Sequence, residues 1–257
     1  MIRSIPILLV GVILLGACDS TESPSGPTIA YGFPNIVTPS PLPDSVAQQY
    51  VEDAALLTFQ ITRGVEGDAA SIVLPDPLRE TLYNALGHVW HSSNLPARDS
   101  VIVQFDIHPF HLHSVHRLRV RVETEADWIQ AWIDGEIMTG NAEVDQITQE
   151  WALTLEEPLD PNDPFPTAQL YSEEARNLLS LSSEFEGIEG VRYANPRSYV
   201  GDGNTIEVAP RENAIEILYS KGFGDCPAGC IGRHYWRFSV AVDGSVEFLE
   251  SYGSPLP

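Results

Sequence analysis

Four of the seven histidines fall between His108 and His116, and histidine is the commonest metal-ligating side chain. In an extended segment His111 and His113 point to the same side, because successive side chains of a strand alternate. With His108 or His116 closing the set from the flanks, the segment would bind Zn or Cu. The alternative is a polar loop between two strands, whose histidines are solvated or hydrogen-bonded.

A second group with reactive chemistry is the pair Cys226 and Cys230, which together with Cys18 are all the cysteines of the chain. In an exported protein these two are expected to form a disulfide that fixes a turn between strands. The alternative is Cu(I) binding with His234, since thiolates and an imidazole suit this ion. The spacing resembles the copper-binding cysteines of Sco-type proteins, which implies a thioredoxin-like fold that the strand pattern here does not match.

Trp128 and Trp132 are four positions apart, so in a helix they lie on the same side. Two interpretations fit this spacing. The rings either pack in the core, which is the expectation for a short amphipathic helix, or form an aromatic platform for glycans.

The start of the chain indicates export. Arg3 precedes the apolar run 5–15, and Gly16 and Ala17 come directly before Cys18. This pattern resembles a bacterial lipoprotein signal, because an apolar run of about 10 residues is too short to span a bilayer. Cleavage would remove residues 1–17 and leave a lipidated Cys18 at the new terminus. The alternative is an ordinary secretory signal in which the cysteine is incidental.

Residues 18–44 are expected to form a flexible tether, because prolines are interspersed there with serine, threonine, glycine and aspartate. Such a composition buries too little apolar surface to fix a structure. The alternative is that residues 29–31 and 36–37 dock on the folded domain as edge segments.

The charge of the chain restricts its partners. The 36 Asp and Glu residues against 14 Lys and Arg give a formal net charge of −22. A chain this acidic repels phosphate backbones and anionic headgroups, so neither nucleic acid nor adsorption to a membrane surface is expected. The lipid on Cys18 would be the contact with a bacterial membrane, with the body of the protein in the periplasm or on the cell surface.

Hydrophobic periodicity predicts an α+β fold for residues 45–257, with helices on one face of a mainly antiparallel sheet. Helices are expected over residues 45–63, 76–91, 126–133, 142–151 and 167–181. Strands are expected over residues 101–107 and 118–122, the latter with Arg117, Arg119 and Arg121 between its apolar residues. A C-terminal β-meander is expected from the strands at residues 191–193, 205–209, 214–221, 234–242 and 245–252. If two subdomains exist, they would meet near the turn-rich segment 158–166.

Three segments are similar to segments of uncharacterised bacterial lipoproteins: residues 96–101 (PARDSV), 224–231 (GDCPAGCI) and 233–238 (RHYWRF). The resemblance implies export and lipidation and no particular chemistry. The sequence therefore favours a lipid-anchored extracytoplasmic binding or interaction protein, with no resident cofactor and no catalytic residue singled out. The alternative is a metal-dependent enzyme or metal carrier, built on the segment 108–116 or on Cys226, Cys230 and His234.

Overall fold

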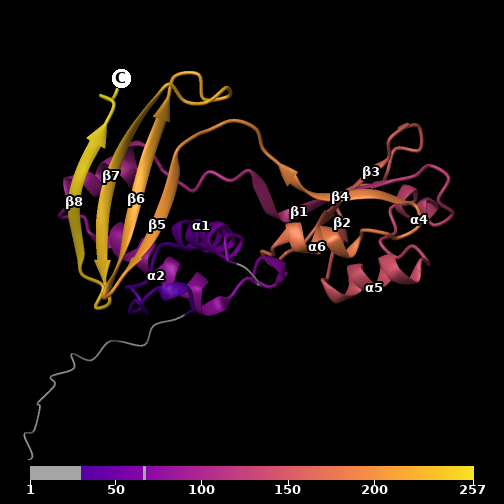
Figure 1. Ribbon diagram of the computed structural model, residues 1–257, viewed down its shortest axis with the longest axis horizontal. Coiled ribbons are helices and arrows are strands. Elements are labelled where there is room, and N and C mark those ends of the chain that lie inside the picture. The colour runs from indigo at the N-terminus through magenta and orange to yellow at the C-terminus, as the bar shows by residue number, and fades with distance from the viewer. Residues whose placement is uncertain (1–29, 66–67) are drawn as a thin grey trace, which may run out of the picture.

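The computed structural model describes residues 30–65 and 68–257, which form two lobes side by side (Figure 1). The predicted signal peptide, Cys18 and the start of the predicted tether lie outside the described residues. The first lobe combines three helices with the last four strands: α1 (Asp44–Thr62), α2 (Asp76–His91), α3 (Pro96–Asp99), β5 (Thr205–Arg211), β6 (Ala214–Phe223), β7 (Gly232–Ala241) and β8 (Val246–Gly253).

The second lobe, residues 113–198, is inserted between the helices and the strands of the first lobe. Its elements are β1 (His113–Val122), α4 (Ile129–Ile133), α5 (Ala142–Glu150), β2 (Thr154–Leu155), β3 (Thr167–Tyr171), α6 (Leu178–Glu184) and β4 (Val191–Ser198). The connections that enter and leave this lobe run together, because the Tyr199 N–H donates to the Leu112 carbonyl at 2.9 Å and the Phe110 N–H donates to the Thr205 hydroxyl at 3.1 Å.

Each lobe contains one four-stranded sheet, and every strand pairing is antiparallel. The order in the first lobe is β5-β6-β7-β8, so the predicted C-terminal meander is confirmed for four of its five strands. The fifth, predicted at residues 191–193, is part of β4 and pairs with β1 in the second lobe. The order in the second lobe is β2-β3-β1-β4. The predicted α+β class is confirmed, with the strands divided between two sheets.

Two hydrophobic cores correspond to the two lobes, and a smaller cluster joins them. The first core packs α1 and α2 against the inward residues of β6 and β7, and the second packs α4, α5 and α6 against β1 and β3. The smaller cluster contains Leu56, Phe59, Leu74 and Val115, all buried, where α1 meets β1. The segment 158–166 lies inside the second lobe, between β2 and β3, so the lobes do not meet there.

Two of the predicted elements are wrong, and in both the tertiary packing decides the local structure. Residues 100–104 continue α3 as a π-helical turn, Ser100–Gln104, in place of the predicted strand 101–107; Val101 and Phe105, four positions apart, both pack on the first core. Residues 167–171 form β3 in place of a helix, because Ala168 and Leu170 alternate into the second core beside β1. Only the end of the predicted helix 167–181 is helical, in α6.

The predicted tether is too long, since residues 33–42 pack against α2. Phe33 and Ile36 are each 2% exposed and belong to the first core. His88 bonds to the Val37 carbonyl at 2.8 Å, and His91 bonds to the Ser40 carbonyl at 2.9 Å. Residues 36–37 are therefore docked on the first lobe, as the alternative to a flexible tether proposed.

The Cys226 and Cys230 sulfur atoms lie at disulfide distance in the connection between β6 and β7, as predicted. Asp202 ties this connection to the segment that leaves the second lobe. Its carboxylate accepts hydrogen bonds from the Arg233 guanidinium at 2.5 Å and from the Cys230 N–H at 3.3 Å. Within the described part of the chain, no helix has the length and apolar character needed to cross a bilayer.

Candidate functional site

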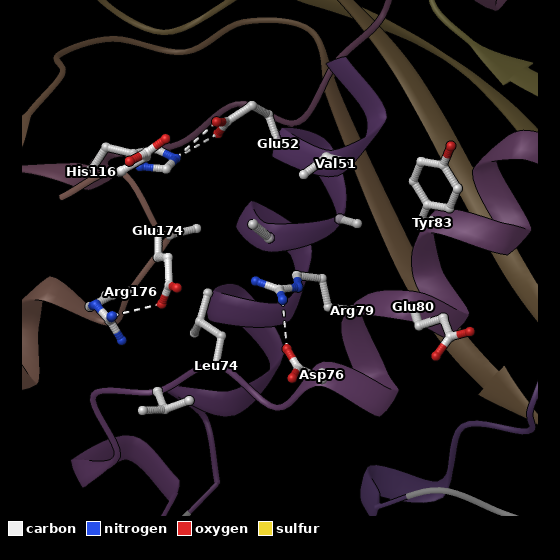
Figure 2. A pocket seen from close by; sticks show the side chains of 15 residues that line it. Val51, Glu52, Leu74, Asp76, Arg79, Glu80, Tyr83, His116, Glu174 and Arg176 are labelled. Carbon is white, nitrogen blue, oxygen red and sulfur yellow. Dashed lines mark hydrogen bonds and ion pairs between the residues drawn. The ribbon is translucent and has the colours of Figure 1, made fainter. Parts of the chain in front are cut away.

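A cavity of about 620 Å³ lies where the two lobes meet (Figure 2). The first lobe contributes α1, the segment that leads into α2, and the first turns of α2. The second lobe contributes His116 of β1 and the segment 173–176, and Val73 and Arg176 form an isolated antiparallel bridge across the junction. The cavity therefore exists only when both lobes are folded and in contact.

The floor of the cavity is apolar. Ala55 and Leu74 are 1% and 2% exposed and belong to the small cluster that joins the lobes. Val51 and Val73, by contrast, are 52% and 54% exposed. Apolar side chains left open to solvent in a concave surface are typical of a site that binds the apolar part of a ligand.

Charged side chains surround this floor, and most of them are paired with each other. Figure 2 shows three ion pairs, at 2.5, 2.7 and 2.8 Å, formed by Arg79 with Asp76, Arg176 with Glu174, and His116 with Glu52. Two further carboxylates of the wall, Glu80 and Glu173, form no ion pair within residues 30–65 and 68–257. The cavity wall thus carries an excess of negative charge.

His116 is held by hydrogen-bond acceptors on both sides of its ring. Its Nδ1 lies 2.8 Å from the Ser172 carbonyl oxygen, and its Nε2 lies 2.8 Å from Glu52 Oε1. Because a carbonyl and a carboxylate only accept hydrogen bonds, both ring nitrogens must donate, which requires the imidazolium form. Burial alone lowers the pKa of His116, but these two bonds outweigh it, so the pKa lies above its ordinary value of 6.5.

The pKa of Glu52 is shifted in the direction expected for a carboxylate paired with a cation. The hydrogen bond from His116 holds the pKa of Glu52 below its ordinary value of 4.5. Glu52 and His116 also line a smaller cavity of about 240 Å³, together with Arg117, Tyr171 and Tyr199. The pair is therefore part of the wall of both cavities.

Asp53, the next residue of α1, holds a second histidine. Its side chain is 1% exposed, and its Oδ2 lies 2.7 Å from His108 Nδ1, while His108 Nε2 lies 3.2 Å from Asp106 Oδ1. The bond to Asp53 raises the pKa of His108. Burial raises the pKa of Asp53, and the hydrogen bond from His108 opposes that effect. Adjacent carboxylates on α1 thus bind both ends of the histidine-rich segment.

The two middle histidines of the predicted metal site have other neighbours. The His111 ring packs edge-on against Tyr199 at 4.8 Å between centroids, and His113 Nδ1 lies 3.2 Å from the Ser198 hydroxyl. Across the described ranges, no three His, Cys, Asp or Glu side chains are placed to hold a metal ion. His108, His113 and His116 each have a hydrogen-bond partner and His111 packs on Tyr199, which agrees with the alternative of hydrogen-bonded histidines; metal binding stays a prediction.

The second predicted metal-binding set, Cys226, Cys230 and His234, also has other partners in the structure. Cys226 and Cys230 bond to each other, while His234 Nδ1 lies 2.9 Å from the Ser254 carbonyl oxygen and its ring packs on Trp236. The His234 side chain therefore connects β7 to the segment that directly follows β8.

Glu52 and Arg176, which line the cavity, and Asp53, which binds His108, were not singled out from the sequence. One signal was present for Asp53: it lies between Tyr50 and Leu57 at helical spacing, so a carboxylate falls on the buried stripe of α1. A buried carboxylate requires a partner. The partner, 55 residues away, could not be read from local pattern.

No protein-family model matches the chain, and neither a curated protein nor a solved structure matches it. The resemblance to bacterial lipoproteins therefore stays a prediction.

Proposed function

We propose that this protein is a lipid-anchored, extracytoplasmic binding protein that holds a small amphipathic, cationic ligand between its two lobes. The observation that carries the proposal is the cavity of about 620 Å³, with an apolar floor and a wall of mostly paired charges. Ligand sites commonly have volumes of about 300–1,000 Å³ and are mainly apolar, with a few polar groups that orient the ligand.

The state of His116 favours binding over catalysis at this cavity. A general base needs a ring nitrogen that is free to accept a proton from a substrate. Both nitrogens of His116 donate to acceptors of the protein, Glu52 and the Ser172 carbonyl, so neither can accept. The pair instead fixes the position of β1 relative to α1 and thereby the shape of the cavity.

The excess of carboxylates in the cavity wall indicates the charge of the ligand. The three ion pairs neutralise Asp76, Glu174 and Glu52, which leaves Glu80 and Glu173 as uncompensated carboxylates beside the exposed Val51 and Val73. A ligand with an apolar body and an ammonium or guanidinium group complements both features.

The anchor is tested at Cys18, which the lipoprotein interpretation makes the acyl acceptor. Cys18→Ala is expected to abolish lipid attachment and to leave the protein unprocessed or in the aqueous phase of a detergent partition, because stable anchoring of an acidic protein depends on its acyl chains. Cys226→Ser is the matched control and should stay in the detergent phase. Wild-type protein in the aqueous phase would rule out the anchor.

The cavity is tested with dansylcadaverine, a probe that joins an apolar ring system to a primary amine. Calorimetric titration is expected to show saturable binding by the full chain, and Val73→Trp should weaken it at least tenfold by filling the cavity. Val103→Trp is the control, since Val103 is 68% exposed on the π-helical turn and lies outside the cavity. Equal affinity of all three proteins, or equal binding of the acidic probe dansylglycine, would contradict the proposed site.

A further inference from the structure

The sheet of the second lobe has one face covered by helices and one face without them. Figure 1 shows α5 and α6 on one side of this sheet, and Ile129 and Trp132 of α4 belong to the core that lies there. Along β1, Leu118, Val120 and Val122 are 0–2% exposed and face these helices. Because side chains alternate along a strand, the arginines between them point to the opposite face. That face, here named the arginine face, consists of Arg117, Arg119 and Arg121 and their neighbours on β3 and β4.

The register of the strands sets those neighbours. Arg119 stands opposite Gln169 of β3 and Asn195 of β4, and Arg121 stands opposite Tyr193. Buried residues of β3 and β4 alternate with these, so the neighbours share the outer face. The arginine face therefore presents guanidinium, amide and phenol groups in adjoining rows.

The positive charge on this face is exceptional for so acidic a chain. Five of the 14 Lys and Arg residues lie on β1 and β4: Arg117, Arg119, Arg121 and Arg197 on the arginine face, and Arg192 where the register of the two strands shifts at its edge. Two of these have carboxylate partners, Arg117 with Glu156 at 2.8 Å and Arg192 with Glu123 at 3.5 Å. Arg119, Arg121 and Arg197 form no ion pair within the part of the chain that the structure describes.

Aromatic rings hold several of these guanidinium groups in place. The Arg121 guanidinium lies 4.2 Å from the centroid of Phe165 and 5.8 Å from that of Tyr193. Arg117 lies 5.6 Å from the Tyr171 ring. Such contacts order the cation but leave the edge of the guanidinium free to donate hydrogen bonds. The Nε of Arg121 is buried, and among the described residues it has no hydrogen-bond acceptor.

The arginine face ends in a hollow at each side. The cavity of about 240 Å³ lies at the Arg117 end. A cavity of about 220 Å³ lies at the other end, and its lining includes the carboxylates Glu123 and Glu125 as well as Arg121, Phe165 and Arg192. Alternate residues of a strand are about 6.8 Å apart, so the three arginines of β1 extend over about 14 Å. An extended, repeating anion suits this arrangement better than a single small ion.

We propose that the arginine face binds a carboxylated polysaccharide. Guanidinium groups bind carboxylates through two parallel hydrogen bonds, and the amides of Gln169 and Asn195 can bond the hydroxyl groups between them. Nucleobases would need open ring faces for stacking. Here Phe165 and Tyr171 already carry a guanidinium over one face, which favours a ligand that is recognised by its charges and hydroxyls. The placement of such a glycan outside the cytoplasm rests on the function proposed above.

The test uses the full chain in non-ionic detergent and a galacturonate decamer as probe. Calorimetric titration at low salt is expected to show binding that the fully methyl-esterified decamer, which has the same sugars without charge, does not show. Arg119→Gln with Arg197→Gln should weaken binding about tenfold or more, since the variant loses two charged hydrogen-bond donors to the carboxylates of the decamer.

The matched control is Arg211→Gln with Arg237→Gln. It removes the same charge from the outer face of the other sheet, where these residues pair with Glu216 and Glu250. Binding of the decamer should be unchanged in this control and in Val73→Trp. Equal weakening in both double variants, no binding by the wild type, or equal or tighter binding of a thymidine decamer would each overturn the proposal. None of these outcomes affects the anchor or the cavity between the lobes, which have their own tests.

Discussion

Asp53→Ala is expected to lower the free energy of unfolding by about 3 kcal/mol, the lower end of what is found when one partner of a buried ion pair is removed. Asp53 is 0% exposed, and its carboxylate accepts hydrogen bonds from His108 at 2.7 Å and from Gln49 at 3.2 Å. The variant leaves the half-buried His108 without this partner and opens a small void beside the first core. Urea unfolding at pH 6 measures the loss.

The pH dependence of that loss identifies its cause. The pKa of His108 is raised above its ordinary value of 6.5, so the pair stabilises the fold fully below pH 6.5 and loses this contribution as pH rises through the raised pKa. The difference between wild type and Asp53→Ala should therefore shrink from pH 6 to pH 9. Glu52→Gln is the control, because Glu52 is 43% exposed and its pair should contribute less than about 1 kcal/mol. A difference that stays constant with pH, or an equal loss in the control, would contradict this account.

Trp132→Ala is expected to lower the free energy of unfolding by about 4 kcal/mol, as is typical when a large buried aromatic residue is removed. Trp132 is 0% exposed in the second core, and its Nε1 donates to the Ile137 carbonyl at 3.2 Å. The variant therefore creates a cavity and leaves a carbonyl group without its donor. Urea unfolding followed by circular dichroism measures the loss.

Trp128→Ala is the comparison that separates a core residue from a surface platform. Trp128 packs edge-on against Trp132 at 5.2 Å between centroids but is only partly buried, and its Nε1 donates to the Glu189 carbonyl at 3.1 Å. Its removal should cost about 1 kcal/mol, since it loses one hydrogen bond and part of an aromatic contact. A loss in Trp132→Ala no larger than in Trp128→Ala would mean that the second core does not depend on this ring.

The fold was predictable where local pattern and tertiary packing agree. Asp243 and Gly244 form the turn between β7 and β8, and the alternation that follows predicts the meander that is observed. Residues 167–171 were predicted to be helical, and they are a strand because β1 lies beside them. Local periodicity carries no information about such a neighbour: Arg119 and Gln169, which lie opposite each other in the sheet, are 50 residues apart in the sequence.

Local sequence pattern also predicts the arginine face only in part. The alternation of Arg117, Arg119 and Arg121 with apolar residues is plain in the sequence, but their partners Tyr171 and Tyr193 follow only from the register of β3 and β4. The net charge of −22 also averages over the chain and conceals a face with the opposite sign. Composition predicts the average partner of a protein, while the gathering of charges on one strand decides the local partner.

The insertion of one lobe within the other sets an order of events during synthesis. Residues 113–198 are contiguous, so the second core can close as soon as β4 has emerged from the ribosome. The apolar stripes of α1 and α2 emerge earlier, yet the sheet that covers them ends only at Gly253. The apolar residues of α1 and α2 are therefore synthesised early but stay exposed to solvent until the last strands are complete. These two helices are the segments to which a chaperone would need to bind.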